Sequence, residues 1–220
     1  MSFVSQAIMR FHLWRLSRGL FGGRRWYQYI EFEGGLTTER WGAGELKPRT
    51  SSFRTYLEEQ FELTQDDIVV DIGSNAGLFT LLTAQHCKHA FGVEIDKGFD
   101  RQARFLKKKY GEAGLRVDNV TFIRGSITEH LDIMKTATVI LASKILYHDL
   151  LGGGLDEMME AIENGMSRVV LMQGHSVPAR GPLGTDDGMR RLFEKYGFHY
   201  ELSANVPEFP IATATRRTGL

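Results

Sequence analysis

Two acidic residues and two glycines lie at the spacing of a nucleoside-binding turn. Asp71 follows the apolar run at 68–70, and Gly73 and Gly77 come shortly after it. Glycine lets a ligand approach the backbone closely and permits a positive φ in a tight turn. Glu94, 23 residues after Asp71, ends the next apolar run, where a carboxylate can accept hydrogen bonds from both hydroxyls of a ribose. The spacing therefore predicts a ligand that carries a ribose.

The glycine pattern narrows the kind of ribosyl ligand. A dinucleotide site needs G-x-G-x-x-G, and a phosphate-binding loop needs G-x-x-x-x-G-K-[ST]. This turn instead has G-x-x-x-G from Gly73 to Gly77, and it begins with the acid Asp71, which would repel a phosphate. An anionic strand end favours a cationic ligand, such as a sulfonium that carries an amino-acid tail.

Strands and helices alternate around these residues, and the alternation predicts how they are brought together. Five apolar runs are expected to be strands: 68–70, 90–93, 120–123, 138–141 and 169–172. Helices are expected at 78–86, 98–110, after 144, at 155–164 and at 186–196. This order is typical of a parallel, doubly wound sheet with right-handed crossovers. Two consecutive strands at 198–206 and 211–216 should close the sheet as an antiparallel hairpin.

The glycine turn and the second acid carry a resemblance to a known class of enzymes. Residues 69–80, Val-Val-Asp-Ile-Gly-Ser-Asn-Ala-Gly-Leu-Phe-Thr, resemble motif I of class I S-adenosylmethionine-dependent methyltransferases. The Gly-x-Asn-x-Gly form is similar to FkbM-type and tRNA wobble-uridine carboxymethyltransferase-like members, and Gly-Val-Glu-Ile-Asp at 92–96 resembles the second motif. The resemblance covers about residues 60–217 and implies a Rossmann-like, mostly parallel seven-stranded α/β sheet that binds S-adenosyl-L-methionine.

The same resemblance assigns the residues of the cofactor site. The expected cofactor-binding residues are Asp71, Gly73, Asn75, Gly77, Glu94, Ile95, Ser126 and Ile127. By position, Glu94 holds the ribose, the two glycines line the methionine moiety, and Asp71 organises the turn and can bind the ammonium. Ile95 packs on the adenine, and residues 126–127 lie at its edge. Many members have Asp where Ser126 stands.

The catalytic candidates follow the fourth and fifth expected strands. Methyl transfer needs positioning and, for a hydroxyl acceptor, removal of one proton. His148, in a Leu-Tyr-His segment similar to that of the wobble-uridine group, is the first candidate for the base, and His175 is the second. The alternative for His148 is a packing role in a helix. The segment has neither the Asn/Asp-Pro-Pro-Tyr motif of amino-directed enzymes nor a cysteine nucleophile.

Metal ions and nucleic acid are not expected partners. The available acids near the expected site have no recognisable ligand spacing; they are Asp149, Asp156, Asp186, Asp187 and Glu208. Lys and Arg (27) balance Asp and Glu (27), so no overall charge recruits a polyanion. The run at 107–109 is interpreted as a solvated helix face, and Cys87, the only cysteine, as a buried thiol in a reducing, cytoplasmic protein.

The N-terminal region is expected to be an extension of the cofactor-binding domain. Residues 1–60 predict a helix, a short strand, a loop and a second helix, and residues 61–220 the domain itself. Arginines alternate with apolar residues over 1–25, which favours a helix packed on the domain or on a second subunit of a homodimer. The alternatives are peripheral attachment to an anionic membrane and a lid over the site.

These features predict methylation of an oxygen on a small-molecule or saccharide acceptor. The wobble-uridine resemblance leaves modification of tRNA as an alternative within the same enzyme class. The arginine-rich and aromatic N-terminal region leaves a non-catalytic or membrane-associated member of the fold as an alternative outside it.

Overall fold

The computed structural model describes most of the chain from Phe53 onwards. The described residues are 53, 55–57, 59, 61–143, 145–146, 154–173, 181–202 and 211–217. The helix, strand and loop expected within residues 1–50 lie outside this set, and so do the roles expected of residues 1–25. No helix within the described ranges is long and apolar enough to cross a membrane.

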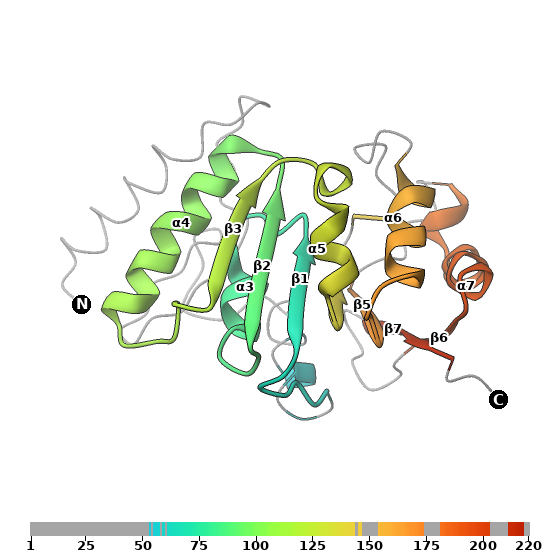
Figure 1. Ribbon diagram of the computed structural model, residues 1–220, viewed down its shortest axis with the longest axis horizontal. Helices are drawn as coiled ribbons and strands as arrows, with labels where there is room; N and C mark the ends of the chain where they lie inside the picture. The colour runs from blue at the N-terminus through green and yellow to red at the C-terminus, as the bar shows by residue number, and fades with distance from the viewer. Residues whose placement is uncertain are drawn as a thin grey trace, which may run out of the picture.

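A seven-stranded sheet forms the centre of the described part (Figure 1). Its strands are β1 (Ile68–Ile72), β2 (His89–Glu94), β3 (Val120–Arg124), β4 (Val139–Leu141), β5 (Val169–Gln173), β6 (Phe198–Leu202) and β7 (Ile211–Arg216). They follow the order β3-β2-β1-β4-β5-β7-β6, and the pairs among β1 to β5 are parallel. β7 runs antiparallel between β5 and β6. The expected parallel sheet with a closing antiparallel hairpin is confirmed.

Helices cover both faces of the sheet. They are α3 (Leu78–Thr83), α4 (Lys97–Glu112), α5 (Leu131–Thr136), α6 (Leu155–Glu163) and α7 (Asp186–Lys195), with short 3-10 turns η1 (Ile127–Glu129) and η4 (Pro182–Gly184). In Figure 1, α5 and α6 lie in front of the sheet and α3 lies behind it. α3 and α4 share one apolar core with the sheet, while α5, α6 and α7 share the other. The described part of the chain is therefore a three-layer α/β domain.

The apolar residues of the sequence explain both layers. β1 and β5 are nearly continuous apolar runs, as expected of parallel strands covered on both faces. α4 buries Ala103, Leu106 and Tyr110 at spacings of three and four residues, so one stripe of the helix faces the sheet. Asp96 caps its first turn by accepting hydrogen bonds from two backbone N–H groups. The local sequence thus fixes both where α4 starts and which face it buries.

The end of the expected N-terminal extension packs on this core. Phe53, Tyr56 and Leu57 are helical and buried with the residues of α3. The ring centroid of Phe53 lies 4.0 Å from that of Phe79. These residues precede the expected domain boundary at residue 60, and their packing ties the end of the extension to the sheet.

Two helices differ from the sequence expectation. The helix expected over 78–86 ends at Thr83, because the amides of Gln85 and His86 donate to the carbonyls three residues earlier and the Asn119 side chain donates to the carbonyls of Ala84 and Cys87. α5 was not expected at all, since its six residues are too few to show a helical period. The thiol of Cys87 is buried as expected, and burial raises its pKa to about 12.

Candidate cofactor site

The glycine turn connects β1 to α3 through residues with positive φ. Gly73, Asn75 and Gly77 have φ of 67°, 56° and 83°. Gly77 has a second requirement, because a Cβ there would lie 2.4 Å from Cζ of Phe122. The turn is held to β2 by the amide groups of Gly73 and Ser74, which both donate to the carbonyl of Val93, at 2.9 and 3.1 Å. The backbone is therefore fixed in a form that glycine permits and most residues do not.

Glu94 lies beside this turn at the carboxyl end of β2. Its Oε2 accepts a hydrogen bond from the Asn75 amide at 2.8 Å, and its Oε1 accepts one from the Asp96 amide, also at 2.8 Å. Burial raises the pKa of the carboxyl group, and these two backbone donors act in the opposite direction. Each carboxylate oxygen has a second lone pair. The group can therefore accept two further hydrogen bonds, as a vicinal diol would supply.

Asp71 is buried directly beneath the turn. The hydroxyl of Thr80, in α3, donates to Oδ2 of Asp71 at 2.7 Å, and both side chains are almost fully buried. A Cβ at Gly92 would lie only 2.8 Å from that hydroxyl. Gly92 has an ordinary backbone, so its glycine is needed for space and not for conformation. Thr80 is not among the site residues expected from the sequence, because its contact with Asp71 depends on how α3 packs on β1 and β2.

The polar atoms of the turn fit a ligand with hydrogen-bonding groups. Three buried side-chain atoms in the described ranges have no hydrogen-bond partner, and two of them, Ser74 Oγ and Asn75 Oδ1, belong to this turn. Next to Glu94, the side chain of Ile95 is 41% exposed although it is large and apolar. A ribose on Glu94, polar groups on the turn and an aromatic base on Ile95 match the parts of S-adenosyl-L-methionine.

The end of β3 lies beside the same site. The amide of Gly125 donates to the carbonyl of Glu94 at 3.1 Å. Ser126 then caps η1, since its Oγ accepts from the Thr128 amide and its own amide donates to the Glu129 side chain. Ile127 is buried in the core. The structure thus uses the side chains of residues 126 and 127 internally, and the predicted contact with adenine would fall to their backbone atoms.

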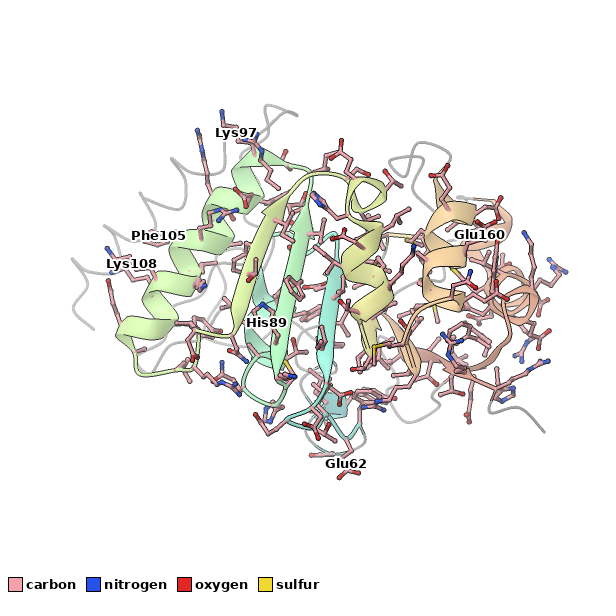
Figure 2. All side chains as sticks on the ribbon, in the orientation of Figure 1. Glu62, His89, Lys97, Phe105, Lys108 and Glu160 are labelled. Atoms are coloured by element: carbon pink, nitrogen blue, oxygen red, sulfur yellow. The ribbon has the colours of Figure 1, made fainter. Side chains whose placement is uncertain are left out.

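The acceptor side of the site is described only in part. Ile145, after β4, packs against the turn, because a Cβ at Gly73 would lie 3.1 Å from its Cδ1. Ile145 is not among the site residues expected from the sequence, although its position just after a strand end indicates a place near the site. His148 and His175 lie outside the described residues, so their roles as bases stay predictions. Figure 2 shows Lys97, the first residue of α4, beyond the arrowheads of β1–β3, where the cofactor site lies.

Two of the described acidic residues that were weighed as metal ligands, Asp156 and Asp186, have other partners. Asp156 accepts from Lys195 and from the Tyr196 hydroxyl, and Asp186 accepts from the Tyr200 hydroxyl at 3.0 Å. These contacts join α6 and α7 to each other and to β6. Within the described ranges, no group of three or more His, Cys, Asp or Glu residues is placed to hold a metal ion.

The basic run on α4 also has internal partners. Lys107 Nζ donates to the carbonyl of Val120 on the edge strand β3, and Lys109 pairs with Glu112. Lys108 is the most exposed of the three and lies 3.8 Å from Glu112. Two of the three lysines of the run therefore stabilise the surface of the domain itself.

The strand order and the site together define a class I S-adenosylmethionine-dependent methyltransferase, so the expected class, fold and cofactor are confirmed. Within that class, the chain belongs to the family described as "Histone methylation protein DOT1", whose family model matches residues 42–176.

Solved structures agree with the fold. The N-terminal domain of EvdMO1 with S-adenosylhomocysteine bound has a TM-score of 0.61 at 14% identity, over 96% of this chain and 97% of that one. Precorrin-6y C5,15-methyltransferase from Geobacter metallireducens has a TM-score of 0.57 at 16% identity, over 74% and 87%.

Curated relatives share parts of the chain. Protein arginine N-methyltransferase 1 of Saccharomyces cerevisiae is 24% identical over 159 residues, which are 69% of this chain and 44% of that protein. Ribosomal RNA small subunit methyltransferase A of Desulfotalea psychrophila is 35% identical over 83 residues, which are 38% of this chain and 24% of that protein. The chain thus spans less than half the length of these relatives.

Proposed function

We propose that the protein transfers a methyl group from S-adenosyl-L-methionine to a hydroxyl oxygen of a small-molecule or saccharide acceptor. The observation that carries the cofactor half is the buried carboxylate of Glu94 beside the glycine turn. For the acceptor half, support comes from the aliphatic side chain of Ile145, which lies against Gly73. A charged acceptor beside Ile145 would lose hydration and gain no ion-pair partner from it, so an uncharged acceptor is favoured. The single buried thiol, Cys87, fits a reducing compartment, and we place the protein in the cytoplasm.

In this proposal the cofactor supplies an electrophilic methyl group on a sulfonium, and the protein supplies position and proton removal. Glu94 would accept hydrogen bonds from the ribose hydroxyls, and the turn from Gly73 to Gly77 would hold the other end of the cofactor. Ile145 excludes water from the reacting face. A ring nitrogen of His148, the predicted base, would take the proton from the acceptor hydroxyl as the O–C bond to the methyl group forms and the S–C bond of the sulfonium breaks, with S-adenosylhomocysteine as the leaving group.

The cofactor assignment is tested by calorimetric titration with S-adenosylhomocysteine. Glu94→Gln preserves the shape of the side chain and removes its charge, so the affinity should fall by at least about tenfold. Glu62→Gln is the matched control, because Glu62 is exposed and lies at the opposite end of the sheet (Figure 2). Equal affinities for the wild type and Glu94→Gln would overturn the assignment of Glu94.

The acceptor assignment is tested with methyl-labelled cofactor. The protein is incubated separately with a small-molecule filtrate, a protein fraction and an RNA fraction of the same lysate. The proposal expects label in the filtrate, in base-stable ether linkages to oxygen, and loss of turnover in His148→Ala. Label confined to protein or to RNA would refute a small acceptor.

A protein acceptor is the second candidate. The family description names histone methylation, and the yeast relative that matches 69% of this chain is a protein arginine methyltransferase. In that case the label would appear on lysine or arginine side chains after acid hydrolysis of the protein fraction. The same experiment therefore separates an oxygen acceptor from a nitrogen acceptor.

A further inference from the structure

The hydroxyl of Thr80 has an unusual partner for a threonine in a helix. Threonine hydroxyls in helices commonly donate to a carbonyl one turn earlier, and Thr83 of the same helix does this, with its Oγ1 2.9 Å from the carbonyl of Phe79. Thr80 instead donates out of the helix to Oδ2 of Asp71, at 2.7 Å. Both threonines are completely buried. The Thr83 hydroxyl therefore bonds within its own helix, while the Thr80 hydroxyl connects the helix to the acid at the end of β1.

The contact between Thr80 and Asp71 is a charge-assisted hydrogen bond at the base of the glycine turn. Asp71 ends up in register with Gly92 of β2 and Leu141 of β4, at the carboxyl end of the sheet. The acid is 2% exposed, so the direction of its carboxylate is set by protein donors and not by bulk water. Hydrogen bonds to charged groups are stronger and more directional than neutral ones.

The surrounding residues keep this hydroxyl in place. A side chain at Gly92 would meet Oγ1 of Thr80 at 2.8 Å and the ring of Phe122 at 2.7 Å. The same ring closes the space behind Gly77, where a Cβ would lie 2.4 Å away. The missing side chain of Gly92 therefore leaves the space that the Thr80 hydroxyl and the Phe122 ring occupy, and interiors packed this closely hold side chains in one rotamer.

We propose that Thr80 is a positioning residue that orients the Asp71 carboxylate toward the cationic amino-acid end of the cofactor. Without this hydroxyl, the Asp71 carboxylate loses a buried donor that helps to set its direction, and the cofactor loses a fully oriented anionic partner. Thr80 itself touches no cofactor atom and acts through Asp71. The proposal rests on the cofactor assignment made above and extends it to a residue inside α3.

Paired variants on one helix test this. Thr80→Val and Thr83→Val make the same chemical change at two fully buried positions of α3. Each variant is titrated with S-adenosylhomocysteine in a calorimeter and unfolded in urea. Thr80→Val should lose about tenfold in affinity, Thr83→Val less than twofold, and Thr80→Ser should restore the affinity, because it keeps the hydroxyl.

The outcomes separate the two assignments. If the wild type binds and Thr80→Val binds as tightly as Thr83→Val, the positioning role is refuted while the cofactor site stands. If the wild type fails to bind, the cofactor assignment falls and the role of Thr80 falls with it. Should Thr80→Val not fold, Thr80→Ala and Thr83→Ala give the same comparison with smaller side chains. Loss of affinity in Thr80→Ser equal to that in Thr80→Val would also refute the role of the hydroxyl.

Discussion

The carboxylate of Asp67, at the end of the sheet opposite the cofactor site, is expected to stabilise the folded state. It accepts hydrogen bonds from the amide and hydroxyl of Thr64, from the hydroxyl of Thr138 at 2.7 Å, and from Nε and Nη2 of Arg168 at 3.1 and 2.8 Å. Thr138 precedes β4, and Arg168 precedes β5. One side chain therefore fastens the starts of β1, β4 and β5.

The pKa of Asp67 gives the size of its contribution to the free energy of unfolding. Burial alone would raise the pKa, but the hydrogen bonds from Arg168, Thr64 and Thr138 and the charge of Arg168 lower it to about 2. Against an unfolded value near 4, this shift corresponds to about 2.5 kcal/mol. Because the side chain of Arg168 is 46% exposed, solvent screens part of the attraction, and about 2 kcal/mol is the expected value.

The direction of the pKa shift determines the pH range over which Asp67 stabilises the folded state. The folded state favours the ionised carboxylate, so the contribution is complete above about pH 5 and is lost as the pH falls from about 4 toward 2. About half of it should be gone at pH 3.

Urea unfolding of the wild type and Asp67→Asn at pH 7, 5, 4 and 3 measures the effect. We expect Asp67→Asn to be about 2 kcal/mol less stable at pH 7, with the difference shrinking to about half at pH 3. Asp66→Asn is the matched control, because Asp66 is the adjacent residue and is exposed, and it should change the free energy of unfolding by less than about 0.5 kcal/mol. A difference for Asp67→Asn that stays constant from pH 7 to pH 3 would refute the reasoning.

Three further predictions concern Gly77, Arg216 and Cys87. Gly77 and Gly114 both have φ of 83°, but only Gly77 has Phe122 in the way of a Cβ. Urea unfolding should therefore show about 1–2 kcal/mol lost in Gly114→Ala and clearly more in Gly77→Ala; equal losses would contradict this. Arg216 donates to four carbonyls at and beyond the end of α6, so Arg216→Lys should cost about 2 kcal/mol in the same assay, and an unchanged midpoint would show that the forked geometry is unimportant. Cys87 should resist alkylation at pH 8 until urea unfolds the chain, and modification of the native protein would contradict its burial.

The sequence was most informative where the chemistry is local. The turn from Asp71 to Gly77 needs a positive φ at Gly73 and Gly77, and glycines are recognised directly in the sequence. Glu94 ends a strand that is predicted by the apolar residues before it. The hairpin was predictable because two strand-like segments follow each other without a helix between them. The parallel order of the other strands followed from their alternation with helices. All of these depend on short stretches of chain or on the order of elements.

What the sequence did not reveal depends on contacts between distant residues. Thr80 looks like any helical threonine until α3 packs on β1 and brings its hydroxyl to Asp71. From the sequence, Gly92 is only a residue that weakens a strand. The structure shows that the absence of a side chain there makes room for the ring of Phe122, 30 positions later. Both cases share a physical cause: the space that one small residue leaves is filled by a group from another element. A search for further positioning residues should therefore begin from strand glycines with ordinary φ, because their missing side chain marks where a distant group must fit.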